Sequence, residues 1–408
     1  MRVRNIAWSV AVAVCLLGGA IGAGWFVLSH RVPTQATGPA LRQLLDREVA
    51  DGSIHHAVLA VASGDGRFQW SGAAGLAHGG SSAPMNASTP IRIASITKLY
   101  TATVVMRLEE QGLVALDDPM AKYLPHVLID RIAVLDGIDY TDRITLRQLL
   151  AHRSGIADYY DTPGPDGQSL YQHFLDQPTR RWAVDDTIAR ARQLRATSVP
   201  GTRTTYADTN YQLLGKVIEA VTQRPLHVVY NDVIFRPLGL KRTWLEGHPP
   251  ADLGPGDAPA HVFDGARDID AVRANGSYWA DGGIVSTANE MIVFLKALHE
   301  GRILQASTVE RMHDWQPMRF PLRYGYGTMH FALPWPLDAA LGLPPLWGHS
   351  GSTGSFLYRA EDSDLYFAGT LDQTDAQRAP FTLIAQTLST VRSALSAQTT
   401  SAPSDSGR

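Results

Sequence analysis

Cysteine is almost absent from this sequence, because Cys15 is the only one among its 408 residues. A single cysteine excludes an internal disulfide, and the chain also lacks the CxxC and Cys/His spacings that are typical of zinc sites. Its stability must therefore come from packing. At 408 residues and 45% hydrophobic composition, the chain is long and apolar enough to bury a sizeable core.

An excess of one charge is also missing. The formal net charge is −3, and no block of lysine and arginine is interleaved with aromatic residues, so the sequence lacks the electrostatic footprint of a nucleic-acid-binding protein. The histidines form no metal motif: His55 and His56 are an isolated pair without H-E-x-x-H, and His152 and His261 have no partners at ligand spacing. We expect no nucleic-acid partner and no metal, and a small molecule or peptide as the ligand.

One long hydrophobic run is present, and it lies at the N-terminus. Residues 6–28 contain no charged side chain, follow Arg2 and Arg4, and exceed the roughly 20 apolar residues that a membrane-spanning helix needs. The run continues through Trp25 and Leu28, beyond the usual length of a signal-peptide core, which favours a retained anchor over a cleaved signal. The positive-inside rule then places the rest of the chain outside the cytoplasm, in the periplasm or the extracellular space, or secreted if the segment is cleaved.

The remaining composition predicts one folded domain over residues 40–395. A membrane anchor or signal segment covers 1–30, a linker 31–39 and a disordered tail 396–408. Apolar periodicity predicts strands at both ends of this domain and helices between them, which indicates an α+β fold whose terminal segments share an antiparallel sheet. The expected strands are 56–63, 66–75, 354–360 and 364–372; the expected helices are 41–50, 99–111, 145–153, 185–195, 210–222, one capped by Thr287 and Glu290 and ended by Gly301, and 381–395.

The clearest chemical signal is the stretch SITK, in which Ser95 precedes Lys98 by three residues at the head of the apolar run LYTATVVM. Residues i and i+3 share one face of a helix, so a lysine there can take a proton from a serine, which is a poor nucleophile on its own. At a helix start, unpaired N–H groups point toward the serine, and burial and the helix dipole would lower the lysine pKa. Chance also produces S-x-x-K pairs on solvated helices. Of the five lysines in the chain, however, only Lys98 has a serine three residues before it.

Two further segments carry candidate groups. Tyr206 and Asp208 lie two residues apart on an extended segment and so project to the same side, where a phenol near a cationic lysine can carry a proton. The ordinary alternative is that Asp208 or Thr209 caps the following helix and Tyr206 packs in the core. His349 opens the stretch HSGSTGS, whose glycines would let a substrate approach the backbone closely. Taken alone, this stretch would be an ordinary loop of glycine and serine.

Together, the three segments resemble the serine β-lactamase and penicillin-binding family. The similarity is to the branch that contains class C β-lactamases, D-alanyl-D-alanine carboxypeptidases, D-aminopeptidases and esterases. Residues 95–98 match the S-x-x-K motif, residues 206–208 match Y-x-N with Asp in place of Asn, and residues 349–351 match the H-x-G form of the third motif. The order of the motifs agrees, and the likeness extends over residues 40–395. It implies a β-lactamase/transpeptidase-like fold, with the active site between an antiparallel sheet and a mostly helical lobe.

The resemblance implies a reaction as well as a fold. Ser95 would attack a carbonyl group and become acylated, Lys98 and Tyr206 would share the proton transfer, and water would release the acyl group. The implied substrates are D-amino-acid peptides, cleaved as by a carboxypeptidase, or small esters and amides. No metal or organic cofactor is needed.

The resemblance also assigns roles on the wall of the cleft. The backbone N–H groups of Ser95 and Ser352 would form the oxyanion hole, with Gly351 and Asp208 beside the substrate. His349 would line the opposite wall, where it would assist proton transfer or hold a substrate carboxylate.

Two departures from the family pattern bear on activity. Asp208 in place of Asn adds a negative charge, which favours a protonated Lys98 and moves the general-base role toward Tyr206; this is a hypothesis. His349 in place of Lys removes the permanent cation that suits the carboxylate of β-lactams and peptide ends, so peptidase or esterase activity is favoured over β-lactamase activity. The insertion at 157–182 either edges the cleft and shapes specificity or is a surface loop without substrate contact.

Two rival functions fit the sequence less well. An α/β-hydrolase would need G-x-S-x-G, and the nearest candidate, residues 348–352, reads GHSGS and lacks the final glycine. A membrane-anchored binding protein for cell-wall fragments or β-lactams would keep the fold without turnover. The intact Ser95, Lys98 and Tyr206 favour an enzyme over this alternative.

Overall fold

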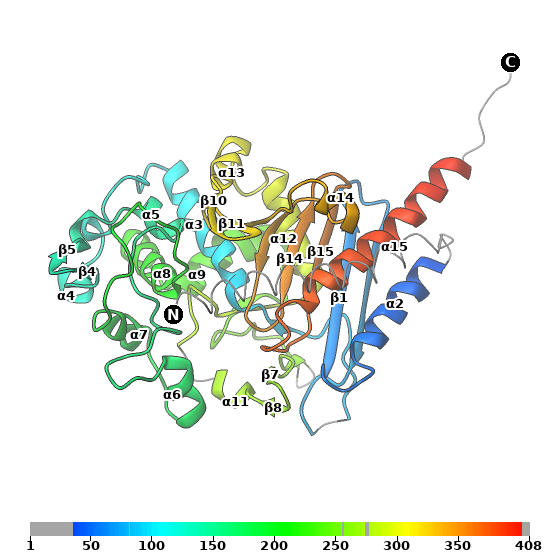
Figure 1. Cartoon of the computed structure of the whole chain (residues 1–408), viewed down its shortest axis with the longest axis horizontal. Helices are drawn as coiled ribbons and strands as arrows, with labels where there is room; N and C mark the ends of the chain where they lie inside the picture. The colour runs from blue at the N-terminus through cyan, green and yellow to red at the C-terminus, as the bar shows by residue number, and fades with distance from the viewer. Residues whose placement is uncertain (1–35, 81, 255–256, 274–276, 402–408) are drawn as a thin grey trace, which may run out of the picture.

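An eight-stranded antiparallel sheet forms the centre of the fold, in the order β10-β11-β12-β13-β14-β15-β1-β2 (Figure 1). The structure is a computed structural model that describes residues 36–80, 82–254, 257–273 and 277–401. The strands of this sheet are β1 (His56–Ser63), β2 (Gln69–Gly75), β10 (Gln316–Arg319), β11 (Leu322–Tyr324), β12 (Met329–Phe331), β13 (Leu346–Ser350), β14 (Phe356–Ala360) and β15 (Leu365–Thr370). Because β1 pairs with β15, with Val58 opposite Thr370, the two ends of the chain share one sheet. The predicted α+β arrangement is confirmed.

Strand β1 is buried along its whole length, because helices cover both faces of the sheet. Alternate side chains enter two cores: Val58 and Ala60 belong to one, and Leu59 and Val61 to the other, as the period of two in a strand requires. Helix α12 (Ala288–His299) packs on the first face. Helices α2 (Thr37–Glu48) and α15 (Ala379–Ser401) lie side by side on the second, in blue and red in Figure 1.

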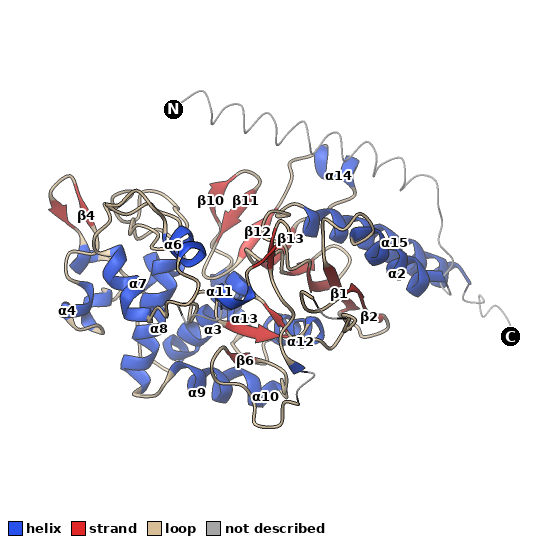
Figure 2. Cartoon of the chain, turned by 90° about the horizontal axis from the view of Figure 1, so that it is seen from below, coloured by secondary structure: helices blue, strands red, loops and turns tan. Residues whose placement is uncertain are grey.

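A mostly helical lobe lies on the other side of the sheet from the α2–α15 pair (Figure 2). Its helices are α3 (Thr97–Glu110), α4 (His126–Ile129), α5 (Leu146–Leu150), α6 (Leu170–Asp176), α7 (Val184–Ala191), α8 (Asp208–Thr222), α9 (Leu226–Tyr230), α10 (Arg236–Leu238) and α11 (Asp270–Arg273). Helix α13 (Ala306–Met312) precedes β10, and α14 (Leu337–Leu341) lies between β12 and β13. A second sheet has three strands, β3 (Ile91–Arg92), β9 (Ile284–Ser286) and β6 (Trp244–Leu245), in the order β3-β9-β6. Two short hairpins, β4 (Val134–Leu135) with β5 (Ile138–Asp139) and β7 (Phe263–Asp264) with β8 (Arg267–Asp268), complete the fold.

Several element boundaries differ from the predicted ones. Helix α2 begins at Thr37, inside the predicted linker, and α15 continues to Ser401, past the predicted start of the tail. The N-cap of α12 is Thr287, whose hydroxyl accepts the Glu290 N–H at 3.3 Å. The Glu290 carboxylate does not turn back to close the predicted capping box; it accepts the N–H groups of Lys241 and Arg242 instead. Tertiary partners thus override a local capping pattern.

The prediction of a membrane anchor is corrected. Among the residues that the structure describes, no helix is long and apolar enough to cross a bilayer. The longest, α15, carries Thr, Ser and Gln throughout its 23 residues, and the predicted span at residues 6–28 lies outside the described part of the chain. The structure gives no support to the membrane partner, or to the location outside the cytoplasm that depended on it.

Candidate active site

Ser95 lies at the junction between the small sheet and the helical lobe. Strand β3 ends at Arg92, residues Ala94–Ile96 form a 3-10 turn, and α3 begins at Thr97. Ala94, directly before the serine, has a φ of 45°, a left-handed backbone conformation that is uncommon for residues other than glycine. The chain therefore turns sharply at the point where it presents Ser95.

Lys98 is completely buried and contacts Ser95. Its Nζ donates to the Ser95 hydroxyl oxygen at 3.1 Å and to the Asp281 carbonyl oxygen at 2.8 Å, and it forms an ion pair with Asp208. Burial by itself would lower the pKa of Lys98, but the negative charge of Asp208 is the main influence that overcomes it and raises the pKa above its ordinary value. The lysine is therefore a cation in the resting site, whereas a serine–lysine pair without Asp208 would favour a lowered pKa.

The Tyr206 hydroxyl is buried close to this pair. It has no hydrogen-bond partner of good geometry among the described residues, and the Lys98 nitrogen lies 5.0 Å from the centre of its ring. Burial raises the pKa of Tyr206 above its usual range, although the nearby Lys98 cation and Ser95 hydroxyl oppose this shift. A phenolate formed here would face a cation, which is the arrangement that a proton carrier needs.

His152 supports Tyr206 from behind, and sequence reasoning missed this role. Its ring packs against the Tyr206 ring at a centroid distance of 4.1 Å, and its Nδ1 accepts the Ala207 N–H at 3.2 Å and lies 3.0 Å from the Asn210 amide nitrogen. Burial and the Lys98 cation hold the pKa of His152 well below its usual value, so the ring is neutral. A lone histidine gives no sequence signal of this kind, because its partners come from another segment.

His349 is completely buried on β13 and does not line the cleft. Its Nδ1 donates to the Ser350 carbonyl at 2.7 Å, which leaves Nε2 to accept the Tyr324 hydroxyl at 3.0 Å. Burial and the Lys98 cation lower the pKa of His349 to about 3. A neutral, enclosed imidazole offers no positive charge to a substrate carboxylate.

The two residues whose N–H groups are the expected oxyanion donors both line the cleft. Ser95 and Ser352 line it together, and among the hydrogen bonds of the described residues neither backbone N–H has an acceptor. Unpaired donors at a reactive serine are suited to an incoming carbonyl oxygen. Gly351 lies behind them, where a Cβ atom would fall 2.6 Å from the Ile93 carbonyl oxygen.

The cleft above Ser95 has a volume of about 110 Å³ and an acidic wall. The residues that line it include no lysine, arginine or histidine; they are Ala94, Ser95, Asp158, Tyr160, Asp161, Tyr206, Asp208, Tyr278, Asp281, Gly282 and Ser352. Three of its acids, Asp158, Asp161 and Asp281, were not foreseen individually, because no local pattern marks a lone aspartate. Two of them belong to the insertion at 157–182, which therefore forms part of the cleft wall.

The carboxyl groups of the cleft repel one another. Burial first, and then the charge of Asp208, raise the pKa of Asp158, Asp161 and Asp281 above that of an ordinary aspartate. Asp281 accepts the Tyr159 hydroxyl at 2.5 Å, whereas Asp161 makes no hydrogen bond or ion pair with any described residue. The cleft therefore holds more carboxyl groups than Lys98 alone can neutralise. Within the described part of the chain, no group of three or more His, Cys, Asp or Glu side chains is arranged to hold a metal ion.

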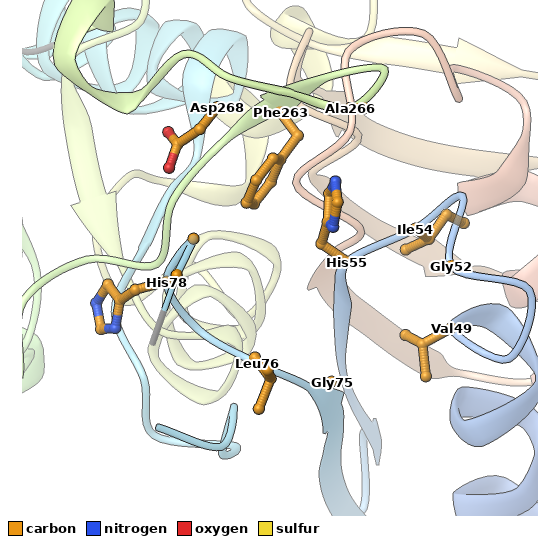
Figure 3. Close-up of a pocket in the computed structure, with 12 residues that line it drawn as sticks. Val49, Gly52, Ile54, His55, Gly75, Leu76, His78, Phe263, Ala266 and Asp268 are labelled. Atoms are coloured by element: carbon orange, nitrogen blue, oxygen red, sulfur yellow. The ribbon is translucent and has the colours of Figure 1, made fainter. Parts of the chain in front are cut away.

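A larger cavity, of about 530 Å³, lies elsewhere (Figure 3). His55, Phe263 and Leu76 line it, and it contains none of the candidate catalytic residues. The smaller cleft is the candidate active site because it holds the serine, the tyrosine and the free N–H groups.

Replacing Asp208 by asparagine is expected to shift the acidic limb of the kcat/KM profile to lower pH, by roughly one unit. Burial lowers the pKa of Lys98, and the charge of Asp208 is the strongest influence that raises it; Asp208 raises the pKa of Tyr206 as well. Without its charge both pKa values fall, so either group can act as a base at lower pH. The measurement is ester hydrolysis as a function of pH. Asp185→Asn, which breaks the surface ion pair of Asp185 with Lys216 at 2.7 Å, is the control; an unchanged or upward-shifted limb in Asp208→Asn contradicts this electrostatic role.

Comparisons with known proteins agree with this geometry. A family model described as Beta-lactamase matches residues 41–388. A D-stereospecific amidohydrolase from Streptomyces sp. is 30% identical, with a TM-score of 0.69 over 85% of this chain and 97% of that chain. A D-amino acid amidase from Ochrobactrum anthropi SV3, solved with L-phenylalanine amide, is 25% identical, with a TM-score of 0.70 over 87% of this chain and 98% of that chain. A Salmonella paratyphi A protein that carries the name D-alanyl-D-alanine carboxypeptidase is 24% identical over 74% of this chain and 72% of its own length. The predicted β-lactamase/transpeptidase-like fold is confirmed.

Proposed function

The chain belongs to the Beta-lactamase family and is a serine hydrolase, and we propose that it acts through an acyl-enzyme on Ser95, with amides and esters of D-amino acids as substrates. The observation that carries this proposal is the contact of the Ser95 hydroxyl with Lys98, 3.1 Å away, at a cleft that Ser95 and Ser352 line together. A nucleophile, a proton-transfer group and oxyanion donors are the parts that acyl transfer requires.

The reaction follows from these contacts. The Ser95 oxygen attacks the acyl carbon while its proton passes to Tyr206 in its phenolate form, which the Lys98 cation stabilises. The N–H groups of Ser95 and Ser352 hold the negative oxygen that forms. When this intermediate collapses, the bond to the leaving amine or alcohol breaks and that group takes the proton. Water then attacks the ester on Ser95, releases the acid and restores the serine.

The charge of the cleft supports substrates with a free ammonium group. Asp161 has no partner among the described residues and shares the cleft with Ser95, and its raised pKa reflects burial and the repulsion of Asp208. A substrate ammonium would relieve this repulsion, whereas a substrate carboxylate would add to it, and no cationic residue lines the cleft to receive one. The amidase from Ochrobactrum anthropi, named for D-amino acids and solved with an amino-acid amide, supports the same substrate class.

A substrate panel tests this proposal. We expect D-phenylalanine amide and a p-nitrophenyl ester to be hydrolysed, with D-alanyl-D-alanine and a chromogenic cephalosporin turned over more slowly. Asp161→Asn should lower kcat/KM about tenfold for the free-amine amide and leave the neutral ester unchanged, because the loss is one charge-assisted contact. Asp176→Asn, in the same insertion but outside the cleft lining, is the matched control. An equal loss of kcat/KM on the amide and the ester in Asp161→Asn would show that Asp161 does not bind the substrate ammonium. No turnover of any panel member would contradict the proposed hydrolysis.

A further inference from the structure

The two proposed oxyanion donors are held by different sheets. Ser95 follows β3 of the three-stranded sheet, and Ser352 lies in the loop between β13 and β14 of the eight-stranded sheet. Among the described residues no strand pairs one of these sheets with the other. A hydrogen-bond ladder therefore does not fix the distance between the two N–H groups, although an oxyanion hole requires that distance to be set closely.

Two buried hydroxyl groups cross the gap between the sheets. The Thr353 hydroxyl donates to the Arg92 carbonyl at 3.2 Å, and the Ser355 hydroxyl donates to the Ile93 carbonyl at 2.9 Å. Both side chains have an exposed fraction of 0%, and their oxygens lie 3.2 Å apart. Thr353 directly follows Ser352, so one donor is a single residue from a crossing bond.

Other hydrogen bonds hold the segments at both ends of these two bonds. Arg92 pairs with Val285 in β9, and the Ile93 N–H donates to the Ile284 carbonyl at 3.1 Å. On the loop, the Gln373 N–H donates to the Thr353 carbonyl at 2.8 Å. The two hydroxyls therefore join a segment held by the three-stranded sheet to a loop held by its bond to Gln373.

The loop at 351–355 packs closely against the segment that precedes Ser95. A Cβ atom on Gly351 would lie 2.1 Å from the Ser355 oxygen and 2.6 Å from the Ile93 carbonyl oxygen, so the loop backbone lies directly on the segment before the serine. That segment contains Ala94, whose left-handed φ of 45° persists only where its surroundings enforce it.

The structure assigns Thr353 and Ser355 the role of positioning residues, which lock the loop that carries the Ser352 N–H to the segment that carries Ser95. The role rests on the proposed acyl-enzyme function. Neither side chain lines the cleft, so both act through the backbone groups that they hold.

Thr353→Val and Ser355→Ala test this role, because they remove the hydroxyls with little change of shape. We expect kcat for a p-nitrophenyl ester to fall roughly 10- to 100-fold, as misplacement of a catalytic group does, with KM within about twofold of the wild type. The affinity for a boronic acid, which forms a tetrahedral adduct on the serine and places an oxygen in the hole, should fall in parallel with kcat. Thr353→Ser keeps the hydroxyl and should retain activity.

The control is Thr390→Val, which removes a comparable bond, from a threonine hydroxyl to the Gln386 carbonyl at 2.9 Å, in the remote helix α15. A loss of kcat with unchanged boronate affinity, or full activity in both hydroxyl-free variants, overturns the positioning role. If Thr353→Val does not fold, Ser355→Ala alone decides in the same assays. A wild type without ester turnover or boronate binding overturns the proposed function, and the positioning role falls with it.

Discussion

Replacing Ser95 by alanine is expected to lower kcat by a factor of about 10⁶ on every substrate that the protein hydrolyses, as loss of the nucleophile does in other serine hydrolases. The expectation follows from geometry, because Ser95 lines the cleft and its hydroxyl oxygen accepts a hydrogen bond from Lys98. Covalent labelling by a fluorophosphonate should disappear together with turnover. The measurement is steady-state hydrolysis of a p-nitrophenyl ester, combined with fluorescence of the labelled protein on a gel.

Two observations keep this experiment interpretable. Ser307→Ala, which changes an exposed serine on α13, should leave both readouts unchanged. The melting temperature of Ser95→Ala should remain near that of the wild type, because the change removes one hydroxyl at a cleft. A Ser95→Ala protein that is still labelled and still turns over substrate would exclude Ser95 as the nucleophile.

Replacing Tyr206 by phenylalanine is expected to slow acylation of Ser95 by roughly 10³-fold, within the range of general-base catalysis. Asp208 and Lys98 form a buried ion pair, and the charge of Asp208 helps to raise the pKa of Lys98 despite its burial. A lysine kept protonated cannot accept the serine proton, and the neighbouring phenol remains. Rapid-mixing measurements of the acylation burst, taken across pH, are the readout.

The pH profile separates a base from a packing residue. In the wild type, acylation should rise with pH, because burial raises the pKa of Tyr206 and the phenolate becomes more abundant as pH increases. In Tyr206→Phe this rise should disappear. Tyr140→Phe, at a partly buried tyrosine remote from the cleft lining, is the control. Acylation that stays close to the wild-type rate in Tyr206→Phe would return the base role to Lys98.

The parts of the site that could be predicted from the sequence are those that depend on neighbours along the chain. Ser95 and Lys98 meet because three residues on a helical turn place them on one face. The two strands at the N-terminus were placed well for a similar reason, since apolar runs joined by a glycine turn act locally. The outline of the sheet followed from the order of the strands.

The remaining features depend on residues that only the fold brings together. The Lys98 ammonium donates to the carbonyl of Asp281, 183 positions away, and nothing in the sequence around either residue encodes that contact. His349 matches a family motif, yet its burial and its hydrogen bond to Tyr324 come from a neighbouring part of the sheet. A histidine in a glycine-rich stretch looks accessible in the sequence, and only the packing of the sheet encloses it.

The departures from the family pattern have the same electrostatic effect on the cleft. His349 replaces the family lysine, Asp208 replaces the family asparagine, and Asp158 and Asp161 add two more carboxyl groups from the insertion. Each change moves the site away from recognition of an anion. The proposed preference for a substrate ammonium accounts for all of them with one electrostatic requirement.

Mass spectrometry of the trapped acyl-enzyme is the most direct test of Ser95 as the nucleophile. The wild type is incubated with a fluorophosphonate or an activated D-amino-acid ester, quenched in acid and measured intact, then digested with trypsin, which cuts after Arg92 and Lys98. We predict one adduct per chain, carried by the peptide of residues 93–98 and placed on Ser95 by fragmentation. No adduct from either reagent, or an adduct on Thr97 or on a serine of the loop at 350–355, would contradict it.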